Sequence, residues 1–397
     1  MKRASALAVA ASALLFLTVA FPIWRGLPAT YPLDGQTDWA LARAFVAGDN
    51  PYTPQGLARH HVVDGGRVAH PPTCALWFLP LAGLPLERLN QSWGVFIIAL
   101  LAAQLVLACA ALRLPLAGAF GFLAATVILL QGWFIQHLAI AQTSALVAFL
   151  LVLGWWSLRR GHDRTGGAAV GLACTLKLFP GALLVFLLVT RRWRALAAAG
   201  AAYLAVAAVV TARFGLSCWW LFAAQSERVH PWLGKRYNAS LEAVLLRLTH
   251  PGAADAPVDG WVPAVYPYLL AALLGVTLGL VGRRAHEPRG WDLSFALIAV
   301  VGAYLNPWVW GHYEVLLAWP ALLAGAAIVR GWPSRPLVAA AALLVVMGAE
   351  TLRLFPQAGA PAAELASWIC WPAMIAALAA LLWRRDQGRA RALTAAP

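Results

Sequence analysis

The chain has 397 residues and a formal net charge of +14, yet only 12% of its residues are charged and 61% are hydrophobic. A soluble domain carries about twice that fraction of charge, so the composition excludes an ordinary soluble protein. The positive charge gathers in short stretches between apolar runs. Such stretches are typical of cytoplasmic loops of membrane proteins and not of a nucleic-acid-binding surface. We therefore expect an integral membrane protein with no nucleic-acid partner.

Apolar runs of around 20 residues recur through the chain, and about 20 helical residues cross a hydrocarbon layer of roughly 30 Å. The runs lack the two-residue alternation of a membrane β-barrel. The predicted spans are Ala4–Trp24, Gln91–Leu112, Pro115–Trp133, Gln142–Leu158, Ala195–Ala212, Pro263–Gly282, Trp291–Leu305, Val315–Val329, Pro336–Phe355 and Leu365–Trp383. Together with a split helical hairpin described below, they predict an all-α polytopic protein of about 12 membrane helices. We expect one domain over 1–397, in the cell (inner) membrane, with both termini cytoplasmic.

The first outer loop, Arg25–Pro72, is the most polar part of the chain and holds four of its 16 acids. Asp34 and Asp38 lie four residues apart in it and form a candidate catalytic pair. Asp38 is alternatively the N-cap of a helix over Trp39–Ala47, because Asp is a preferred N-cap residue. Asp34 also fits a Pro-Leu-Asp-Gly turn. His70 closes the loop and is a candidate for substrate contact.

Two segments do not fit a simple alternation of sides. Only one crossing fits between the first outer loop and Arg113, so Pro71–Leu86 should lie in the interface or dip into the membrane and return. Gly166–Thr190 has arginines on both flanks and Lys177-Leu-Phe-Pro180 in its middle. Proline disfavours helix at the preceding residue, so we expect two short helices meeting there, with the lysine facing a polar cavity or an anion. One long kinked helix with a snorkelling lysine is the alternative.

On this topology the polar residues that interrupt apolar runs fall on the outer side. Besides the first loop and Lys177, they lie in the turn Gln131–Gln142, in the second large outer loop Arg213–Val262, and in the turn Asn306–Glu314. Convergence on one face makes them candidates, since each alone has an ordinary structural interpretation. These candidates are Gln136, His137, Gln142, Lys235, Arg236, Asn238, Asn306, Trp310, His312, Tyr313 and Glu314.

The sequence carries no signature of a metal or nucleotide site. It has no glycine-rich phosphate loop and no His-Glu-x-x-His, and its five cysteines show no metal-binding spacing. We interpret most of these cysteines as small core residues, and we expect no metal ligand and no cofactor.

Several short motifs follow one another along the chain: Asp38-Trp39, Gly48-Asp49-Asn50-Pro51-Tyr52, His70-Pro71-Pro72, Ala141-Gln142-Thr143, Gly171-Leu-Ala, Lys177-Leu-Phe-Pro180, Arg191-Arg-Trp193, Asn238-Ala-Ser-Leu241 and Asn306-Pro307-Trp-Val-Trp310-Gly-His312-Tyr313. In this order, and over nearly the whole chain, they resemble glycosyltransferase family 87. The most specific parts are the Lys-x-x-Pro segment between basic turns and the Asn-Pro…Trp-x-His-Tyr turn. The first loop matches more loosely.

The resemblance implies a GT-C fold, a polyprenyl-phosphate-mannose donor, an outward-facing active site and inversion at the anomeric carbon. It also implies a first-loop aspartate as general base, which carries over onto Asp38 because an aromatic residue follows it. Asp34 instead restores the family's usual spacing to Gly48, so the base is one of these two. The chain departs from the family at three motifs: Gly-Gln-x-Asn is Ala141-Gln142-Thr143-Ser144, Tyr-Pro-Pro is His70-Pro71-Pro72, and His-His is His312-Tyr313.

From this resemblance and from the shared face, we expect contacts to the donor phosphate and lipid from Lys177, Lys235, Arg236 and His312. Substrate contacts are expected from His70, Gln142, Asn238, Asn306, Trp310, Tyr313 and Glu314. The predicted function is transfer of a hexose, mannose, from a polyprenyl-phosphate donor to an acceptor glycan or glycolipid, with the lipid bilayer and both substrates as partners.

Two other functions remain alternatives. One is a pentosyltransferase that uses a polyprenyl-phospho-arabinose donor. The other is a transporter or flippase of lipid-linked sugar, for which broken helices should occur in two related halves. The sequence shows one broken hairpin, which favours an enzyme.

Overall fold

The computed structural model describes residues 2–29, 33–60, 70–114, 117–228, 232–235, 238–251, 253, 255–329 and 359–383. These residues are mostly helical, and the strand-like pairing within them is limited to two isolated bridges, Lys235–Asp255 and Asn238–Trp310. The predicted all-α fold is confirmed.

The helices are α1 (Lys2–Gly26), α2 (Leu33–Ala47), α3 (Pro54–Arg59), α4 (Ala75–Phe78), α5 (Leu89–Ala111), α6 (Ala117–Leu129), α7 (Gly132–Ala139), α8 (Ser144–Arg159), α9 (Asp163–Leu176), α10 (Ala182–Val189), α11 (Trp193–Phe214), α12 (Ser217–Arg228), α13 (Leu241–Thr249), α14 (Val262–Arg284), α15 (Pro288–Tyr304), α16 (Ala318–Val329) and α18 (Gly359–Trp383). Several 3-10 helices join them, among them η2 (Pro72–Cys74), η5 (Phe179–Gly181) and η7 (Gly311–Leu317).

Four of the described helices are long and apolar enough to cross a membrane, namely those over Ser5–Gly26, Leu86–Ala111, Trp193–Phe214 and Val262–Arg284. The pair α6 and α7 makes a fifth if it is counted as one broken span. Shorter apolar helices cover Pro72–Leu81, Ser144–Arg159, Phe179–Val189, Gly290–Tyr304 and Trp368–Trp383. The chain is therefore a membrane protein, as its composition predicts. The count of about 12 helices stays a prediction, and the expected span Pro336–Phe355 lies outside the described residues.

The expected span Pro115–Trp133 corresponds mostly to α6, and together with α7 it passes as one broken span. Two helices occupy this region, and α7 departs from the direction of α6 by 77°. The expected turn Gln131–Gln142 is therefore mostly helix α7, preceded by Gln131 in an extended conformation. The chain turns again at Ala141, whose φ of 54° is left-handed. These two changes of direction carry the α7–α8 connection back toward α2.

The predicted break at Lys177 is present. Helix α9 ends at Leu176, Lys177 is extended with φ −145° and ψ 146°, and α10 begins after η5. Pro180 has no backbone N–H and disfavours helix before it, which accounts for the interruption. A continuous kinked helix, the alternative interpretation, is thereby excluded.

Close packing of α9 on α11 fixes where this break lies. Gly167 and Gly171, one turn apart on α9, face the backbone of α11 at Ala195 and Ala199. A Cβ atom on either glycine would lie 2.0–2.1 Å from the facing carbonyl oxygen. Small residues spaced by four are the usual way for membrane helices to approach closely. The position of the α9 end, and so of Lys177, depends on this contact.

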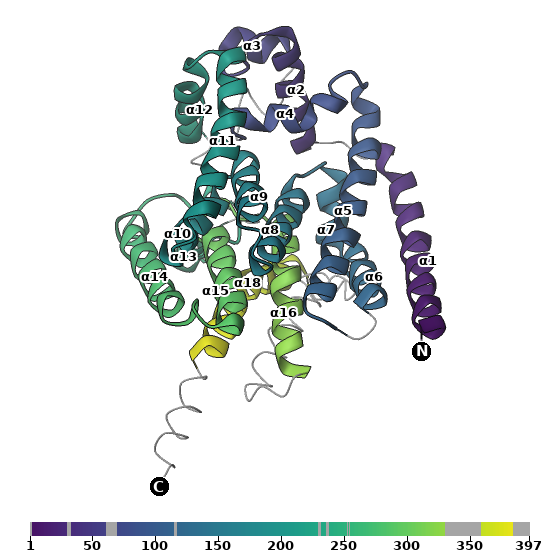
Figure 1. Ribbon diagram of the computed structural model, residues 1–397. Helices are drawn as coiled ribbons and strands as arrows, with labels where there is room; N and C mark the ends of the chain where they lie inside the picture. The colour runs from purple at the N-terminus through teal and green to yellow at the C-terminus, as the bar shows by residue number, and fades with distance from the viewer. Residues whose placement is uncertain are drawn as a thin grey trace.

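Helices of the first predicted outer loop and the first helix of the second gather at one end of the molecule (Figure 1). Figure 1 shows α2, α3, α4 and α12 together at its upper end, whereas the beginning of α1 lies at the lower end. Helix α11 reaches from the centre up to this cap and contacts α2, α4 and α12. Pro71–Leu86, which was expected to lie in the interface or to dip into the membrane and return, is a series of short helical pieces that includes η2 and α4.

Candidate active site

Helix α2 carries both candidate carboxylates on one face. Residues four apart in a helix point in similar directions, so Asp34 and Asp38 lie one above the other. The helix begins at Leu33, and this overturns two local interpretations: Asp38 lies inside the helix and does not cap it, and Asp34 belongs to its first turn and not to a Pro-Leu-Asp-Gly turn.

Tertiary contacts explain why the helix starts early. The first backbone N–H groups of a helix have no partner within it. Here the N–H groups of Asp34 and Gly35 donate to the carbonyl of Ile140, at 3.2 and 2.9 Å. Gly35 permits this approach, because a Cβ on it would lie 2.3 Å from the Ala141 Cβ. At the other end of α2, Arg213 of α11 donates to the carbonyls of Phe45 and Val46.

Asp38 is buried and pairs with His70, whose side chain is partly exposed. The Asp38 side chain is 1% exposed, and its Oδ1 lies 2.7 Å from Nδ1 of His70. The Tyr52 hydroxyl donates a hydrogen bond to the His70 backbone carbonyl at 2.7 Å. This bond ties the end of the first loop to the segment that follows α2. The other Asp38 oxygen, Oδ2, is buried and has no hydrogen-bond partner within the described part of the chain. This oxygen is available to an incoming hydroxyl.

Asp34 has a different environment. Its Oδ2 accepts a 2.5 Å hydrogen bond from Nε2 of Gln142, at the start of α8. Burial raises the pKa of the Asp34 carboxyl, and the neighbouring Asp38 acts in the same direction. His70, the Gln142 hydrogen bond and Lys177 oppose this shift but do not cancel it. Because Asp38, His70, Gln142 and Lys177 all act on the Asp34 carboxyl, these side chains lie near it.

Lys177 is a buried cation at the break between α9 and α10. Its side chain is 6% exposed, and its ammonium donates to the Tyr313 hydroxyl at 2.8 Å. The same ammonium lies 4.4 Å from the centre of the Tyr313 ring, a cation–π distance. Within the described residues, Lys177 makes no salt bridge with an acid. A buried ammonium in this setting is suited to an anionic ligand.

Two histidines stand beside this lysine. The rings of His137 and His312 lie 6.3 Å apart, and His137 stacks on Phe134. Burial, together with the charges of Lys177 and the other histidines, lowers the pKa of His312 well below its ordinary value. His312 is therefore neutral near pH 7 and offers a hydrogen bond instead of the positive charge that was expected of it. Its Nε2 has no partner among the described residues.

The structure thus brings together seven of the predicted site residues: Asp34, Asp38, His70, Gln142, Lys177, His312 and Tyr313. Sequence reasoning placed His137 on this face but gave it no role. It missed Cys74, which lies beside Asp38 and His70, because a lone cysteine at the edge of an apolar run resembles a core residue.

Four other predicted residues belong to a second polar group, formed by the large outer loop and the turn before η7. Lys235 pairs with Asp255 at 2.5 Å, and Asn306 donates to the Trp308 carbonyl at 2.5 Å. Asn238, fully buried, donates to the Pro307 carbonyl at 2.7 Å and accepts from the Ser240 and Val309 amides. Trp310 forms the bridge to Asn238. The Asn238 amide holds the two segments together, and Arg236 lies outside the described residues.

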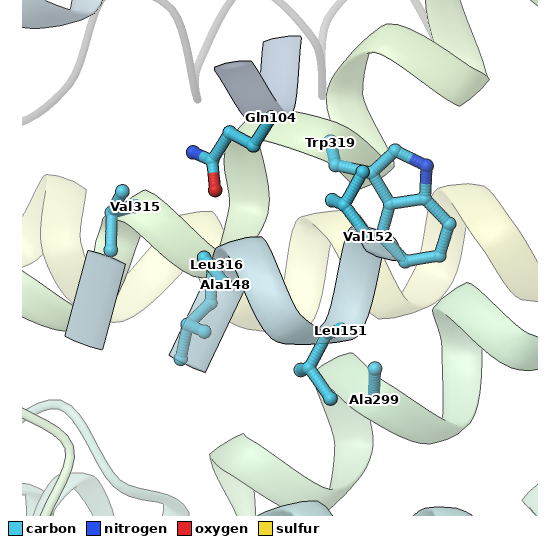
Figure 2. Close-up of a pocket in the computed structure, with 8 residues that line it drawn as sticks. All are labelled: Gln104, Ala148, Leu151, Val152, Ala299, Val315, Leu316 and Trp319. Atoms are coloured by element: carbon cyan, nitrogen blue, oxygen red, sulfur yellow. The ribbon is translucent and has the colours of Figure 1, made fainter. Parts of the chain in front are cut away.

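Glu314, the remaining candidate, is 2% exposed in η7 directly after Tyr313, within electrostatic range of Cys370 on α18. A separate small cavity lies between α5, α8, α15 and α16. Figure 2 shows its lining, which is apolar except for the Gln104 amide and the Trp319 indole. None of the seven converging residues lines this cavity, so the polar cluster remains the candidate site.

Comparison with known proteins agrees with this arrangement. A family model described as glycosyltransferase family 87 matches residues 69–299, more than half of the chain. The match includes His70, Gln142 and Lys177, whereas α2 with its two aspartates precedes it. No curated protein matches the chain. The protein belongs to glycosyltransferase family 87 and is a membrane glycosyltransferase.

Proposed function

We propose that this glycosyltransferase moves mannose from a polyprenyl-phosphate donor to a glycan or glycolipid acceptor at the outer face of the cell membrane, with inversion. One observation carries the proposal. Buried Asp38 and its partner His70, 2.7 Å apart, lie in the same cluster as the buried Lys177 ammonium. A base for an acceptor hydroxyl and a cation for a phosphate are the two groups that such a transfer needs.

Asp38 is the better candidate for the base. A general base needs a lone pair within hydrogen-bond reach of the proton that it takes. Asp38 keeps Oδ2 free of partners among the described residues, while His70 holds Oδ1 and fixes the orientation of the carboxylate. Asp34 already engages Gln142 through its Oδ2. In this scheme Asp34 and Gln142 orient the acceptor or the sugar.

Lys177 supports departure of the donor phosphate. In a single inverting displacement the acceptor oxygen bonds to the anomeric carbon, the bond from that carbon to the phosphate oxygen breaks, and Asp38 takes the hydroxyl proton. The polyprenyl phosphate leaves as an anion, and a buried ammonium stabilises the charge that develops on it. Tyr313, whose hydroxyl now accepts from Lys177, and neutral His312 are placed to hydrogen-bond the phosphate or the sugar.

The second polar group has a different part in this proposal. Lys235 is half-exposed and already paired with Asp255, and the Asn238 amide is satisfied by backbone groups. We assign Lys235 and Arg236 to the path of the lipid phosphate along the outer surface. Asn238, Asn306 and Trp310 hold the turn that presents His312 and Tyr313.

The test is sugar transfer in membranes supplied with polyprenyl-phosphate mannose. Asp38→Asn keeps the shape of the side chain and its hydrogen bond to His70 but cannot take a proton, so we expect a loss of about 100-fold or more in turnover. Asp34→Asn should lose less, because an amide oxygen still accepts from Gln142. Full activity of Asp38→Asn would move the base to Asp34.

The donor is tested in the same membranes. Polyprenyl-phospho-arabinose, the donor of the alternative pentosyltransferase, should be used much less well than the mannose donor. A preference for arabinose would overturn the assignment of the sugar and leave the role of Asp38 intact. Movement of intact lipid-linked sugar across vesicles without any product glycan would instead show a flippase.

A further inference from the structure

Three potential metal ligands meet beside the base that is proposed above. A carboxylate oxygen of Asp38, a ring nitrogen of His70 and the sulfur of Cys74 all lie within 4.8 Å of one another. They come from α2, from the end of the first loop and from η2, so the tertiary fold brings them together. No other group of three such ligands occurs in the described part of the chain.

The ligand set and its burial suit Zn²⁺. Zinc takes thiolate, imidazole and carboxylate ligands at about 2.0–2.3 Å, which places tetrahedral ligands about 3.3–3.8 Å apart. The three atoms, all within 4.8 Å of one another, lie close to that spacing. Asp38 is 1% exposed and Cys74 fully buried, and the second Asp38 oxygen has no partner among the described residues. That buried and unpartnered oxygen is an independent sign of a ligand at Asp38.

Charge balance also favours a divalent ion. With a carboxylate, a thiolate and a neutral imidazole, Zn²⁺ gives a site of zero net charge, which is the least costly state for a buried group. Binding releases one proton, from the Cys74 thiol to solvent. The thiol now donates to the Leu176 carbonyl at 3.3 Å, and that weak hydrogen bond is lost in exchange for a metal–sulfur bond.

We propose that Asp38, His70 and Cys74 form a Zn²⁺ site and that the bound ion inhibits transfer by occupying the carboxylate. The inhibitory part rests on the proposed role of Asp38 as the base, since a carboxylate that ligates zinc has lost the lone pair that would take the acceptor proton. The fourth zinc position would be held by water. The ion would also separate Asp38 from His70, whose hydrogen bond orients the carboxylate.

The binding test uses the purified full-length protein in detergent, after treatment with a chelator. We expect stoichiometric Zn²⁺ by elemental analysis and, with Co²⁺ in its place, a thiolate-to-cobalt charge-transfer absorption. Cys74→Ser should lose both signals, and His70→Gln should lose the zinc. Cys109→Ser changes a buried cysteine on α5 that is not one of the three ligands. This variant should keep both the bound zinc and the cobalt absorption. Absence of stoichiometric zinc from the wild-type protein, or cobalt absorption that survives Cys74→Ser, overturns the site.

The activity test separates the site from the proposed function. Added Zn²⁺ should abolish transfer by the wild-type protein and by Cys109→Ser, chelator should restore it, and Cys74→Ser should be resistant. Faster transfer with zinc would overturn the inhibitory role. If the wild-type protein transferred no mannose under any metal condition, the proposed function would fail, while the cobalt spectrum would still report on the site.

Discussion

At the scale of single residues, two carboxylates respond to pH in opposite ways, Asp34 because it is buried and Asp49 because it is hydrogen-bonded to two basic side chains. Burial raises the pKa of Asp34, so the folded state favours its protonated form. Asp49, two residues after the end of α2, has its pKa lowered by hydrogen bonds from His60 and Arg59. A raised folded-state pKa contributes stability at low pH that is lost as pH rises through that pKa, and a lowered one does the reverse.

We therefore expect Asp34→Asn to gain stability relative to the wild-type protein as pH rises. The two proteins should unfold at similar temperatures near pH 4, about the ordinary pKa of aspartate. The advantage of the variant should grow toward pH 8, because only the wild-type protein then carries a buried charge. Asp49→Asn is the matched control with the opposite sign, since it removes the ion pair between Asp49 and Arg59. Thermal unfolding in detergent across this range measures both. A constant difference for Asp34→Asn at every pH would contradict the expectation.

At the scale of elements, the site depends on where α9 ends. Gly167 and Gly171 let α9 lie directly on the backbone of α11, and Lys177 follows Gly171 by six residues, fewer than two helical turns. A side chain at Gly171 meets a backbone carbonyl at 2.1 Å, which cannot rotate away. A change there must separate the two helices or shift α9 along its axis, and either movement displaces the Lys177 ammonium from Tyr313.

Gly171→Ala should therefore destabilise the protein by about 1–3 kcal/mol, the usual cost of overpacking. Transfer should also fall, with a higher KM for the donor because Lys177 is displaced. Gly200→Ala is the matched control: it lies on α11, and a Cβ there has nothing within 4 Å. That variant should be neutral or slightly more stable, because alanine favours helix over glycine. Chemical or thermal unfolding, measured together with donor kinetics, checks both variants. Equal stability of the two variants would show that the α9–α11 contact is looser than the structure has it.

The elements differ in how far the sequence predicts them. The break at Lys177 is predictable because proline acts locally, through its missing N–H and its effect on the preceding residue. The start of α2 is not, because the carbonyl of Ile140, more than a hundred residues away, supplies the partner for its first amides. Helix α7 is likewise not predicted: the sequence indicates a turn over Gln131–Gln142, and most of that turn is helical.

The candidate site likewise has features that the sequence predicts and features that depend on the folded backbone. Charge patterning was enough to place Asp34, Asp38, Lys177 and the His312 turn on one face. It could not separate His312 and Tyr313, which lie in the cluster, from Asn238, whose amide is used by backbone groups. Hydrogen-bond satisfaction depends on the folded backbone, and sequence spacing does not report it. For the same reason Cys74 was assigned to the core.

At the scale of the whole molecule, the arginine clusters used to assign sides also hold helices together. Arg192 pairs with Asp163 at 2.7 Å and lies over the Trp291 ring, which connects the starts of α9, α11 and α15. Arg159, at the end of α8, lies 3.6 Å from Asp292. These pairs lie at the helix ends opposite the break at Lys177, so the basic side and the polar cluster occupy different ends of the same helices. This separation is what the positive-inside rule predicts for an outward-facing site.

The expected orientation puts the first outer loop outside and the α8–α9 turn in the cytoplasm. Single cysteines test it directly, because the five native cysteines are all buried and free. Gln55→Cys, on exposed α3, should react with a membrane-impermeant thiol reagent in intact cells. Thr165→Cys, exposed near the start of α9, should react only after the membrane is permeabilised. The wild-type protein is the unlabelled control. The reverse pattern would place the polar cluster on the cytoplasmic side, where the donor would have to be loaded from the inner leaflet, and the outer-face proposal would then be wrong.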